Sequence, residues 1–410
     1  MMNLSDPADA EATGVVVTGG RSPNALGVVR GFGRRGVPVF YIDSEPRSLA
    51  RHSRYVHQRV KPHGANGSEA RLIDTLLDLG RRTNHKMVVI PIGDTAVLSL
   101  SRHKEELESH YHVPVASCET IEQLVDKKKF YRLLAAKGIP HPKTYFPDGL
   151  AEVRSIGRGM PYPYIVKPAD SSSFQEAFGR KSFVIESADD LEEATARLRG
   201  RDLEVMIQDI VPGREIYSFY AYYDRNSEPL ALCGYDKTRQ YEPDFGSGSL
   251  CKSIWRPEAA RTALRLLREM SYHGLAEPEL KKDPRDGQYK LLEINARTTL
   301  QNRLPAACGV DIEYAAYLDC LGRKPDPSVR PRSGVLWVDD FADQKSFLIH
   351  LKRRDLSRSE IIDSLKLRKV HSVAAWDDPL PFVVRVARVL WAGFRRVLPR
   401  WAFKTAMDDH

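Results

Sequence analysis

The sequence predicts an α/β domain with a doubly wound parallel sheet, followed by an α+β region and a basic helical tail. Three observations predict this order. The chain opens with a strand–helix–strand pattern. It continues with apolar strands separated by turns that contain proline and glycine. It ends in a stretch whose basic and apolar residues fall on opposite sides of a helix.

The N-terminal segment carries the parallel-sheet prediction. Residues 14–20 (GVVVTGG) have the composition of a buried strand that ends in a glycine turn, and residues 22–36 have apolar side chains at helical spacing. A second strand, VPVFYID, ends at Asp43, and another, MVVIPIGD, ends at Asp94. Strands that alternate with a helix in this way are typical of a parallel α/β sheet.

Length and composition bound the number of domains and the class of protein. The chain has 410 residues, too many for one ordinary core, and we predict domains at 1–118, 119–328 and 329–410. The net charge of +8 suits anionic small molecules or an anionic membrane surface. No basic segment is interleaved with base-stacking aromatic residues, so we expect no nucleic-acid partner. The sequence leaves the oligomeric state open.

Cysteine usage and the N-terminus predict the compartment. The five cysteines are scattered without a CxxC pair, which argues against a disulfide framework or a zinc site and indicates a reducing environment. The segment MMNLSDPADAEATG is polar and acidic, unlike a signal peptide, and no apolar run approaches the length of a membrane span. The sequence therefore predicts a cytoplasmic protein.

Polar residues follow the predicted parallel strands at their carboxyl ends, where ligands bind in such sheets. The candidates for substrate binding are Arg21, Ser22, Asn24 and Asp94. The alternative is that these side chains only cap helices and turns. The turn TGGRSPNALG lacks the GxGxxG spacing, so the sequence does not predict a nicotinamide dinucleotide site.

A β-hairpin is predicted at residues 276–297, with Asp286-Gly287 as the turn. Glu279 and Glu293 are nearly symmetric about this turn, so we expect them to be close to cross-strand neighbours. Alternate residues of a strand share a face, which places Glu293, Asn295 and Arg297 side by side.

The face of this hairpin carries the metal-site prediction. Two carboxylates and an amide oxygen form a ligand set that suits Mg²⁺, which commonly shares its other positions with phosphate and water. The next residue on the face, Arg297, has the donors for bidentate binding of a phosphate or a carboxylate. The alternative is a solvated face with a chance Glu–Arg pair of little energetic value.

Further residues upstream favour a nucleotide. Lys167 closes the predicted strand YIVKP, and Lys127 lies in a predicted helix from Thr120 to Gly138. Backbone groups of residues 208–211 would suit an adenine edge, and Glu215 would accept hydrogen bonds from ribose. The alternative for each charged residue is an ordinary surface position.

These segments together resemble the ATP-grasp superfamily. The order and approximate spacing agree for DK at 126–127, GIPHP at 138–142, YIVKP at 164–168, QDIVPGREI at 208–216, and the hairpin that ends in KLLEINAR. The resemblance covers roughly residues 14–325. Within the superfamily, the N-terminal half is most similar to carboxylate–amine ligases of the D-aspartate ligase type.

The resemblance implies a two-subdomain ATP-grasp fold and an ATP-dependent ligase that forms an amide through an acyl phosphate, releasing ADP and phosphate. It implies a small carboxylate and an amine, such as an amino acid, as substrates. Two Mg²⁺ ions, with Mn²⁺ as an alternative, would bind Glu279, Glu293 and Asn295. The other implied roles are phosphate binding by Lys127 and Lys167, adenine binding by Gln208, Asp209, Ile210 and Val211, ribose binding by Glu215, and stabilisation of the transferred group by Arg297, with Lys237 and Arg239 as extra catalytic cations.

One segment departs from the superfamily pattern. The loop over the phosphates is usually rich in glycine, whereas here it contains Ser171, Ser172 and Ser173. Serine hydroxyl and backbone groups can bind phosphate, but serine turns are stiffer than glycine turns. This loop slightly favours one alternative, a degenerate nucleotide-binding protein at a membrane. The other alternative is an ATP-grasp carboxylase or phosphotransferase that uses the same ATP site.

The tail predicts an amphipathic helix. Residues 382–404 contain six basic and no acidic residues. On a helical wheel four arginines (385, 388, 395 and 396) cluster opposite Val383, Val386, Val389, Leu390, Phe394 and Val397. Such a helix, with Trp391 and Trp401, is typical of a membrane-surface anchor spanning 380–404, and the alternative is a helix docked on the protein's own core. An anchor would suggest an envelope or lipid-linked precursor as substrate at the inner membrane face.

Overall fold

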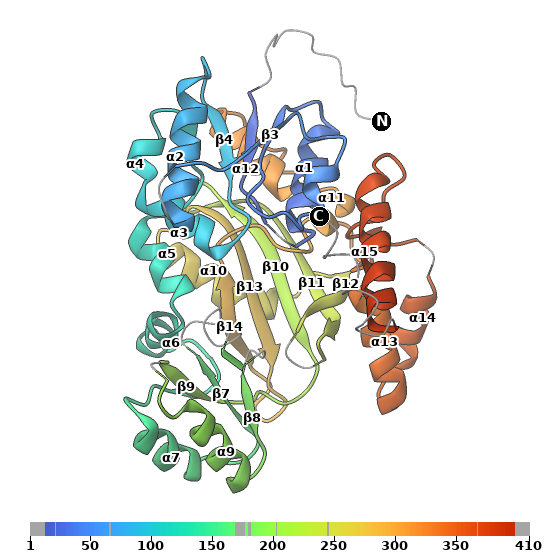
Figure 1. Cartoon of the computed structure of the whole chain (residues 1–410). Helices are drawn as coiled ribbons and strands as arrows, with labels where there is room; N and C mark the ends of the chain where they lie inside the picture. Colours follow the sequence, from blue (N-terminus) through green and yellow to red (C-terminus); the bar gives the residue numbers. More distant parts are fainter. Residues whose placement is uncertain are drawn as a thin grey trace, which may run out of the picture.

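A computed structural model of the chain describes residues 13–20, 22–64, 67–168, 177–178, 182–201, 203–243, 246–366 and 368–397, with side chains up to residue 392 (Figure 1). Figure 1 shows three sheets arranged along the molecule: a parallel sheet at one end, a long and mostly antiparallel sheet in the middle and a small antiparallel sheet at the other end.

The first sheet is parallel, as predicted. Its strand order is β3-β2-β1-β4-β5, with β1 Val15–Val17, β2 Val39–Ile42, β3 Gln58–Val60, β4 Met87–Ile90 and β5 Tyr111–His112. Val15 and Val17 pack in one apolar cluster with helix α1 (Asn24–Gly33), whereas Val16 packs in another with α2 (Ser68–Arg81) and α3 (Asp94–Arg102). Because helices cover both faces, β1 is apolar at every position.

A pair of short helices leads from this sheet to the next. The single helix predicted from Thr120 to Gly138 is wrong, because the structure has α5 (Cys118–Val125) and α6 (Lys127–Ala136) instead. The carboxylate of Asp126 accepts a hydrogen bond from the backbone N–H of Lys129 at 2.9 Å and caps the second helix. This cap starts a new helix axis at Lys127.

The small antiparallel sheet has the order β6-β9-β7-β8. Its strands are β6 Thr144–Tyr145, β7 Tyr164–Pro168, β8 Phe183–Ile185 and β9 Val205–Asp209, and its helices are α7 Leu150–Arg158 and α9 Ala188–Leu198. Residues of these elements form an apolar cluster separate from the other two, with Tyr164, Val166 and Leu191 at its centre. The sheet is therefore a subdomain with its own core.

The central sheet has seven strands in the order β14-β13-β10-β11-β12-β15-β16. They are β10 Ile216–Tyr223, β11 Pro229–Tyr241, β12 Ser247–Ser253, β13 Gly274–Lys282, β14 Tyr289–Asn295, β15 Leu336–Val338 and β16 Val370–His371. Along β10, Tyr217 and Phe219 share an apolar cluster with α10 (Pro257–Glu269), whereas Tyr220 and Tyr222 share the other with α11 (Arg303–Cys308) and α12 (Ile312–Cys320). Helices therefore cover both faces of the central sheet at β10.

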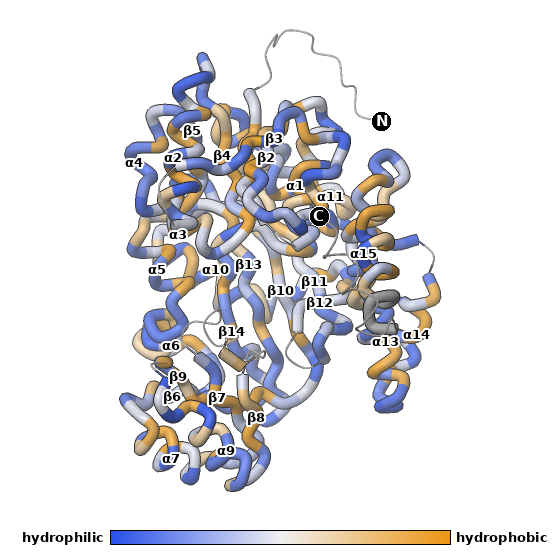
Figure 2. The backbone as a smooth tube through the Cα atoms, in the orientation of Figure 1, coloured by the Kyte–Doolittle hydropathy of each residue, from blue (hydrophilic) through white to orange (hydrophobic). Residues whose placement is uncertain are grey.

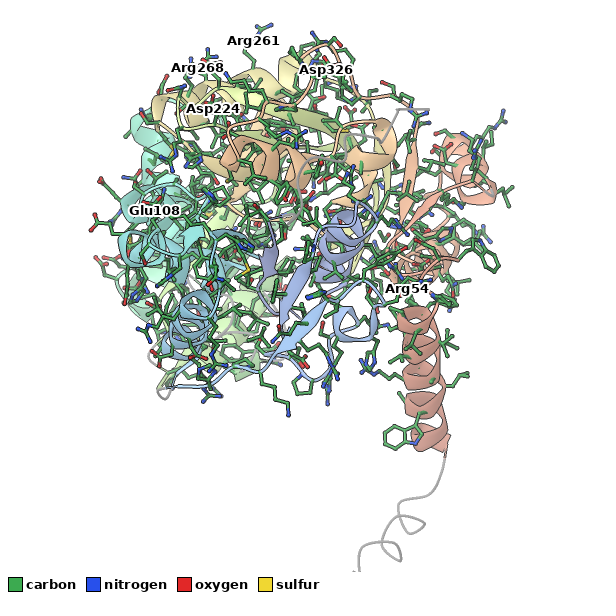
Figure 3. All side chains as sticks on the ribbon, turned by 90° about the horizontal axis from the view of Figure 1, so that it is seen from above. Arg54, Glu108, Asp224, Arg261, Arg268 and Asp326 are labelled. Atoms are coloured by element: carbon green, nitrogen blue, oxygen red, sulfur yellow. The ribbon has the colours of Figure 1, made fainter. Side chains whose placement is uncertain are left out.

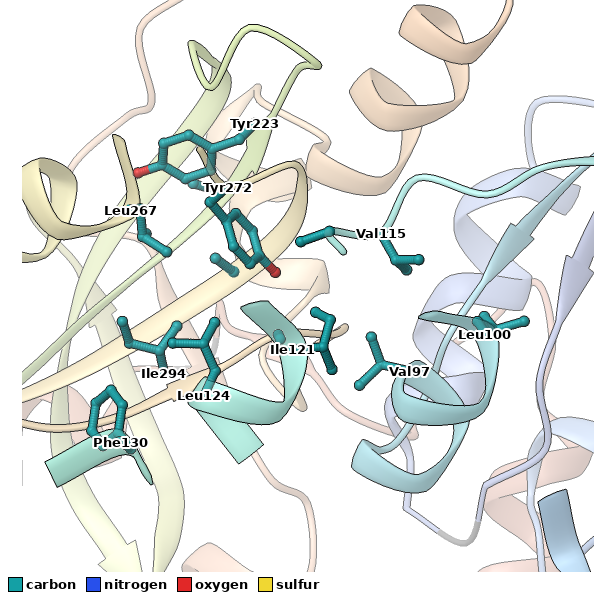
Figure 4. Close-up of a cluster of buried hydrophobic side chains, with 14 of the residues drawn as sticks. Val97, Leu100, Val115, Ile121, Leu124, Phe130, Tyr223, Leu267, Tyr272 and Ile294 are labelled. Atoms are coloured by element: carbon teal, nitrogen blue, oxygen red, sulfur yellow. The ribbon is translucent and has the colours of Figure 1, made fainter. Parts of the chain in front are cut away.

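One apolar cluster joins the N-terminal domain to the central sheet (Figure 4). Figure 4 shows Val97 of α3 beside Ile121 of α5, with Leu124, Ile294 and Tyr272 continuing toward the central strands. A shared core of this kind fixes the position of one domain relative to the other.

The C-terminal extension contributes strands β15 and β16 to the central sheet and the helices α13 (Ala342–Arg353), α14 (Arg358–Leu365) and α15 (Leu380–Val397). It is tied to the N-terminal domain by a buried ion pair, in which Arg30 Nε donates to Asp378 at 2.9 Å. The same carboxylate accepts from Ser53 Oγ at 2.6 Å and from the backbone N–H of Arg54 at 3.0 Å. Among the described helices, none has the length and apolarity needed to span a membrane.

Replacing Asp378 by alanine leaves the buried guanidinium of Arg30 without its carboxylate, so we expect the free energy of unfolding to fall by about 3–5 kcal/mol. Asp377→Ala is the matched control, because Asp377 pairs with Arg34 in a partly exposed bridge and its loss should cost about 1 kcal/mol or less. Urea denaturation followed by tryptophan fluorescence measures both variants. Equal losses would contradict a special role for the buried pair.

Candidate active site

Strands β13 and β14 bring acidic side chains together on one face of the central sheet. Glu279 pairs directly with Glu293, and Glu277 lies opposite Asn295. The expected cross-strand proximity of Glu279 and Glu293 is therefore confirmed. The Asn295 amide donates to Glu277 at 3.2 Å and to Glu293 at 3.3 Å, so it links the carboxylates of the two strands.

Glu277 is a member of this face that the sequence reasoning missed. Its side chain is buried, and it accepts a hydrogen bond from the hydroxyl of Tyr235 on β11. The signal was present in AEPEL, because Glu277 and Glu279 are two residues apart and therefore share a face of the strand. The face carries three carboxylates.

Lys237 of β11 neutralises part of this acidic face. Its ammonium contacts the carboxylate of Glu279 and lies 3.7 Å from Glu277. Burial opposes the charge of the ammonium, but Glu279 and Glu277 outweigh it and raise the pKa of Lys237. The structure thus places the predicted cation Lys237 against the predicted metal ligand Glu279.

Four predicted cations act electrostatically on the carboxylate of Glu293. The side chain of Glu293 is exposed, and partial desolvation acts to raise the pKa of its carboxyl, but the surrounding positive charges outweigh this effect and lower the pKa. These charges belong to four residues from four elements: Lys237 of β11, Lys127 of α6, Arg297 after β14, and Lys167 of β7. The small sheet, the linking helix and the central sheet therefore converge on one carboxylate.

The two lysines on the side of the small sheet favour an anion. Burial, followed by the charge of Lys127, lowers the pKa of Lys167 to about 7, with Glu293 acting in the opposite direction. The Lys167 ammonium lies 5.3 Å from the ring centre of Tyr131, whose hydroxyl donates to the carbonyl of Leu292 at 2.7 Å. Like charges held this close are stabilised by a phosphate or a similar anion.

The N-terminal domain reaches the acidic face through Asp94. Its carboxylate accepts from Arg297 Nε at 3.0 Å, so a predicted substrate residue contacts a predicted catalytic residue. Asn24 is buried and donates to the carbonyls of Thr298 at 2.9 Å and Ile92 at 3.2 Å, which ties the two domains together. Ser22 accepts from the backbone N–H of Asn24 at 3.3 Å.

The segment after β9 holds the predicted adenine and ribose residues. Gln208 is buried and donates to Thr144 Oγ1 at 2.7 Å, and Asp209 pairs with Arg285 at 2.7 Å. Ile210 and Val211 follow β9 directly. Glu215 is exposed at the start of β10, 3.6 Å from Lys282, and lines a cavity of about 320 Å³ on the central sheet.

One predicted catalytic cation is not brought to this group. The guanidinium of Arg239 is fully buried and donates to both oxygens of Asp343 on α13, at 3.0 and 2.6 Å, and to Ser364 at 2.7 Å. Sequence spacing along β11 does not reveal this pairing, because Asp343 lies far away in the chain. Arg21 and Ser171, Ser172 and Ser173 lie outside the described residues.

The donor set fits divalent magnesium in combination with a phosphate. Among the residues with described positions, no three His, Cys, Asp or Glu side chains are grouped to hold a metal ion alone. Glu279 and Glu293 are adjacent, however, and Asn295 adds an amide oxygen on the same face. Mg²⁺ commonly takes one or two carboxylates and completes its shell with phosphate and water, so these residues suit it.

The small sheet supplies Lys167 and the central sheet supplies the paired carboxylates, and the chain has the ATP-grasp fold that the resemblance predicted. No family model matches the chain. The chain is 26% identical to D-aspartate ligase from Enterococcus faecium over 323 residues, covering 75% of this chain and 76% of that protein. The predicted similarity to ligases of this type is confirmed.

Solved structures show the same fold. Carboxyaminoimidazole ribonucleotide synthase from Aspergillus clavatus, complexed with ATP, superimposes with a TM-score of 0.60 at 17% identity, covering 80% of this chain and 82% of that one. L-amino acid ligase from Bacillus licheniformis superimposes with a TM-score of 0.58 at 14% identity, covering 79% and 78%.

Replacing Lys237 by methionine leaves the carboxylates of Glu277 and Glu279 without their cation, so we expect a loss of about 3–5 kcal/mol in the free energy of unfolding near pH 8. The loss should shrink near pH 5, because protonation of a carboxyl whose pKa is raised in the folded state restores stability as pH falls. Urea midpoints at both pH values measure this.

Lys252→Met provides the control for Lys237→Met, because Lys252 pairs with Asp363 in a bridge where the lysine is 39% exposed. It should cost about 1 kcal/mol or less. A loss for Lys237→Met that does not change with pH would contradict the electrostatic account.

Proposed function

We propose that this protein is an ATP-dependent carboxylate–amine ligase that forms an amide through an acyl phosphate and releases ADP and phosphate. The cross-strand pairing of Glu279 with Glu293, with the ammonium of Lys237 against Glu279, is the observation that carries this proposal. The charges of Lys127, Lys167 and Arg297 act on the same pair through Glu293. The alternation of carboxylates and cations on facing elements is what a metal-bound triphosphate requires.

In this proposal the domains are residues 1–118, 119–328 and 329–410, and ATP lies between the small and the central sheets. Lys127 and Lys167 bind its phosphates, together with the serine loop at 171–173. Gln208, Asp209, Ile210 and Val211 bind the adenine, and Glu215 binds the ribose.

Two Mg²⁺ ions, or Mn²⁺ in their place, would be held by Glu279, Glu293 and Asn295. When bound, such ions neutralise charge on the phosphates and on the group being transferred. Lys237 balances the surplus carboxylates of the acidic face, which is the role its contact with Glu279 supports. Arg239 fixes Asp343 of the C-terminal extension and has no direct part in the transfer.

The reaction needs positioning and charge neutralisation more than a nucleophilic side chain. The substrate carboxylate oxygen bonds to the γ-phosphorus as the bond to the β,γ-bridging oxygen breaks, giving ADP and an acyl phosphate. The amine then forms the C–N bond, the phosphate leaves with the C–O electron pair, and the surplus amine proton passes to it. Arg297, held by Asp94, steadies the phosphoryl group, and the two sheets exclude water from the acyl phosphate.

The substrates are a small carboxylate and an amine, with an amino acid as one of them. The names of the similar D-aspartate ligase and L-amino acid ligase support this class. Arg21, Ser22, Asn24 and Asp94 are the proposed substrate residues at the carboxyl edge of the parallel sheet. An envelope or lipid-linked precursor at the inner membrane face is the proposed acceptor, and the basic tail supports it.

Replacing Glu293 by glutamine should lower ADP release by at least about a hundredfold, because it removes the carboxylate on which the cations converge. Glu258→Gln, an exposed position on α10, is the matched control and should keep full activity. The assay measures ADP with a panel of amino acids that includes D-aspartate, against bicarbonate alone. Full turnover in folded Glu293→Gln would remove Glu293 as a metal ligand.

Lys167 should make nucleotide binding depend on pH. With its pKa at about 7, Lys167 loses its charge as pH rises through neutrality, so ATP affinity should fall over this range. Lys167→Arg keeps its charge and should remove this component of the profile. Calorimetric titrations of both proteins across neutral pH test this, and parallel profiles would contradict a phosphate role for Lys167.

A further inference from the structure

Helix α15 leaves the body of the protein after its first turns. Phe382 packs against Phe341 with ring centres 5.8 Å apart, and Val384 packs against the apolar cluster that the N-terminal domain shares with the central sheet. Beyond them Leu390 is 68% and Trp391 57% exposed. Figure 3 shows the helix projecting from the body near Arg54, and Figure 2 shows apolar and polar residues mixed along it. The self-docked alternative therefore applies only to the start of the helix.

The exposed apolar side chains share one side of α15. At 100° per residue, the exposed Val383 and Leu390 form one arc, with the half-buried Val386 between Leu390 and Val389. Val389 and Trp391 lie at the edges of this arc. Arg385 and Arg388 lie on the opposite arc. Amphipathic helices of this kind lie in the interface of a bilayer and do not cross it.

Arg388 joins α15 to a basic cluster on the N-terminal domain. Its Nη1 donates to the carbonyl of Arg47 at 2.6 Å. Helix α15 also contacts the short helix η1 (Ala50–His52), which carries Arg51 and His52. Burial, and then the positive charges of Arg388, Arg51 and Arg59, lower the pKa of His52. We call Arg51, His52, Arg59 and Arg388 the basic cluster.

The basic cluster carries surplus positive charge. Asp43 pairs with Arg51 at 3.1 Å and is its nearest carboxylate. Across the described part of the chain, no carboxylate lies within salt-bridge distance of Arg59 or Arg388. Exposed cations without such partners attract anions.

Three polar atoms at the cluster are buried and have no hydrogen-bond partner among the described residues: Asp43 Oδ1, Arg51 Nε and His52 Nε2. A buried polar atom left without a partner costs about 1–3 kcal/mol. The surplus positive charge of the basic cluster is complementary to the phosphate of an anionic phospholipid such as phosphatidylglycerol.

We propose that α15 and the basic cluster form a docking surface for an anionic phospholipid bilayer. The apolar arc enters the boundary of the acyl chains, while the basic cluster and Arg385 contact the lipid phosphates. A second copy of the chain does not suit this surface, because it would bring two basic clusters together. This inference concerns the place where the protein acts, so a failure of the proposed ligase reaction would not contradict it.

Co-sedimentation of the full chain with vesicles tests the proposal. We expect binding to phosphatidylcholine vesicles that contain phosphatidylglycerol and little binding to phosphatidylcholine alone. Leu390→Asp should weaken the partition coefficient by about tenfold, since it replaces an inserted apolar side chain by a charge. Arg388→Glu should weaken it by about fivefold or more.

Two control variants carry the same chemical changes elsewhere. Leu365→Asp on α14 replaces a leucine that is 73% exposed, and Arg261→Glu reverses an arginine on the side of the molecule far from α15 in Figure 3. Both should bind vesicles as the wild type does. Equal binding of wild type and Leu390→Asp, equal binding to neutral vesicles, or a dimer that Leu390→Asp dissociates would overturn the proposal. ADP release without vesicles should be unchanged in Leu390→Asp.

Discussion

The balance of charge around Glu293 is the constraint on which the rest of the site depends. Three carboxylates on one sheet face would repel one another, and Lys237 within the sheet holds part of that charge. The remaining cations come from other elements, so the site is complete only when the small sheet and α6 stand beside β14. This partly exposed polar face is thereby stable and also suited to bind a metal-bound phosphate.

The fold fixes the position of the N-terminal domain relative to this acidic face. A shared apolar core fixes the N-terminal domain against the central sheet. Asn24 donates hydrogen bonds to the backbone carbonyls of Ile92 in the N-terminal domain and Thr298 after β14. Asp94 accepts a hydrogen bond from Arg297 and thereby orients it. The Arg30–Asp378 pair fixes the C-terminal extension in turn. In the proposed reaction, a substrate at the carboxyl edge of the parallel sheet lies next to the phosphoryl group, and in the proposed docking α15 sets the orientation of the protein at a bilayer.

Local patterns in the sequence predicted much of this arrangement. The pairing of Glu279 with Glu293 could be predicted from the position of the hairpin turn and from the two-residue alternation of side chains along a strand. Both are local properties of the sequence. The break between α5 and α6 was missed, because the apolar spacing continues through Asp126 and only its capping bond ends the first helix. The partners of Lys237 and Arg239 could not be predicted, since Glu279 and Asp343 reach them through tertiary packing.

A crystal structure with magnesium and a non-hydrolysable ATP analogue is the measurement that tests the central claim most directly. The account predicts density for the phosphates between Lys167 and Glu293, with metal density against Glu279, Glu293 and Asn295. Nucleotide bound elsewhere, or phosphates without metal at these carboxylates, would contradict it.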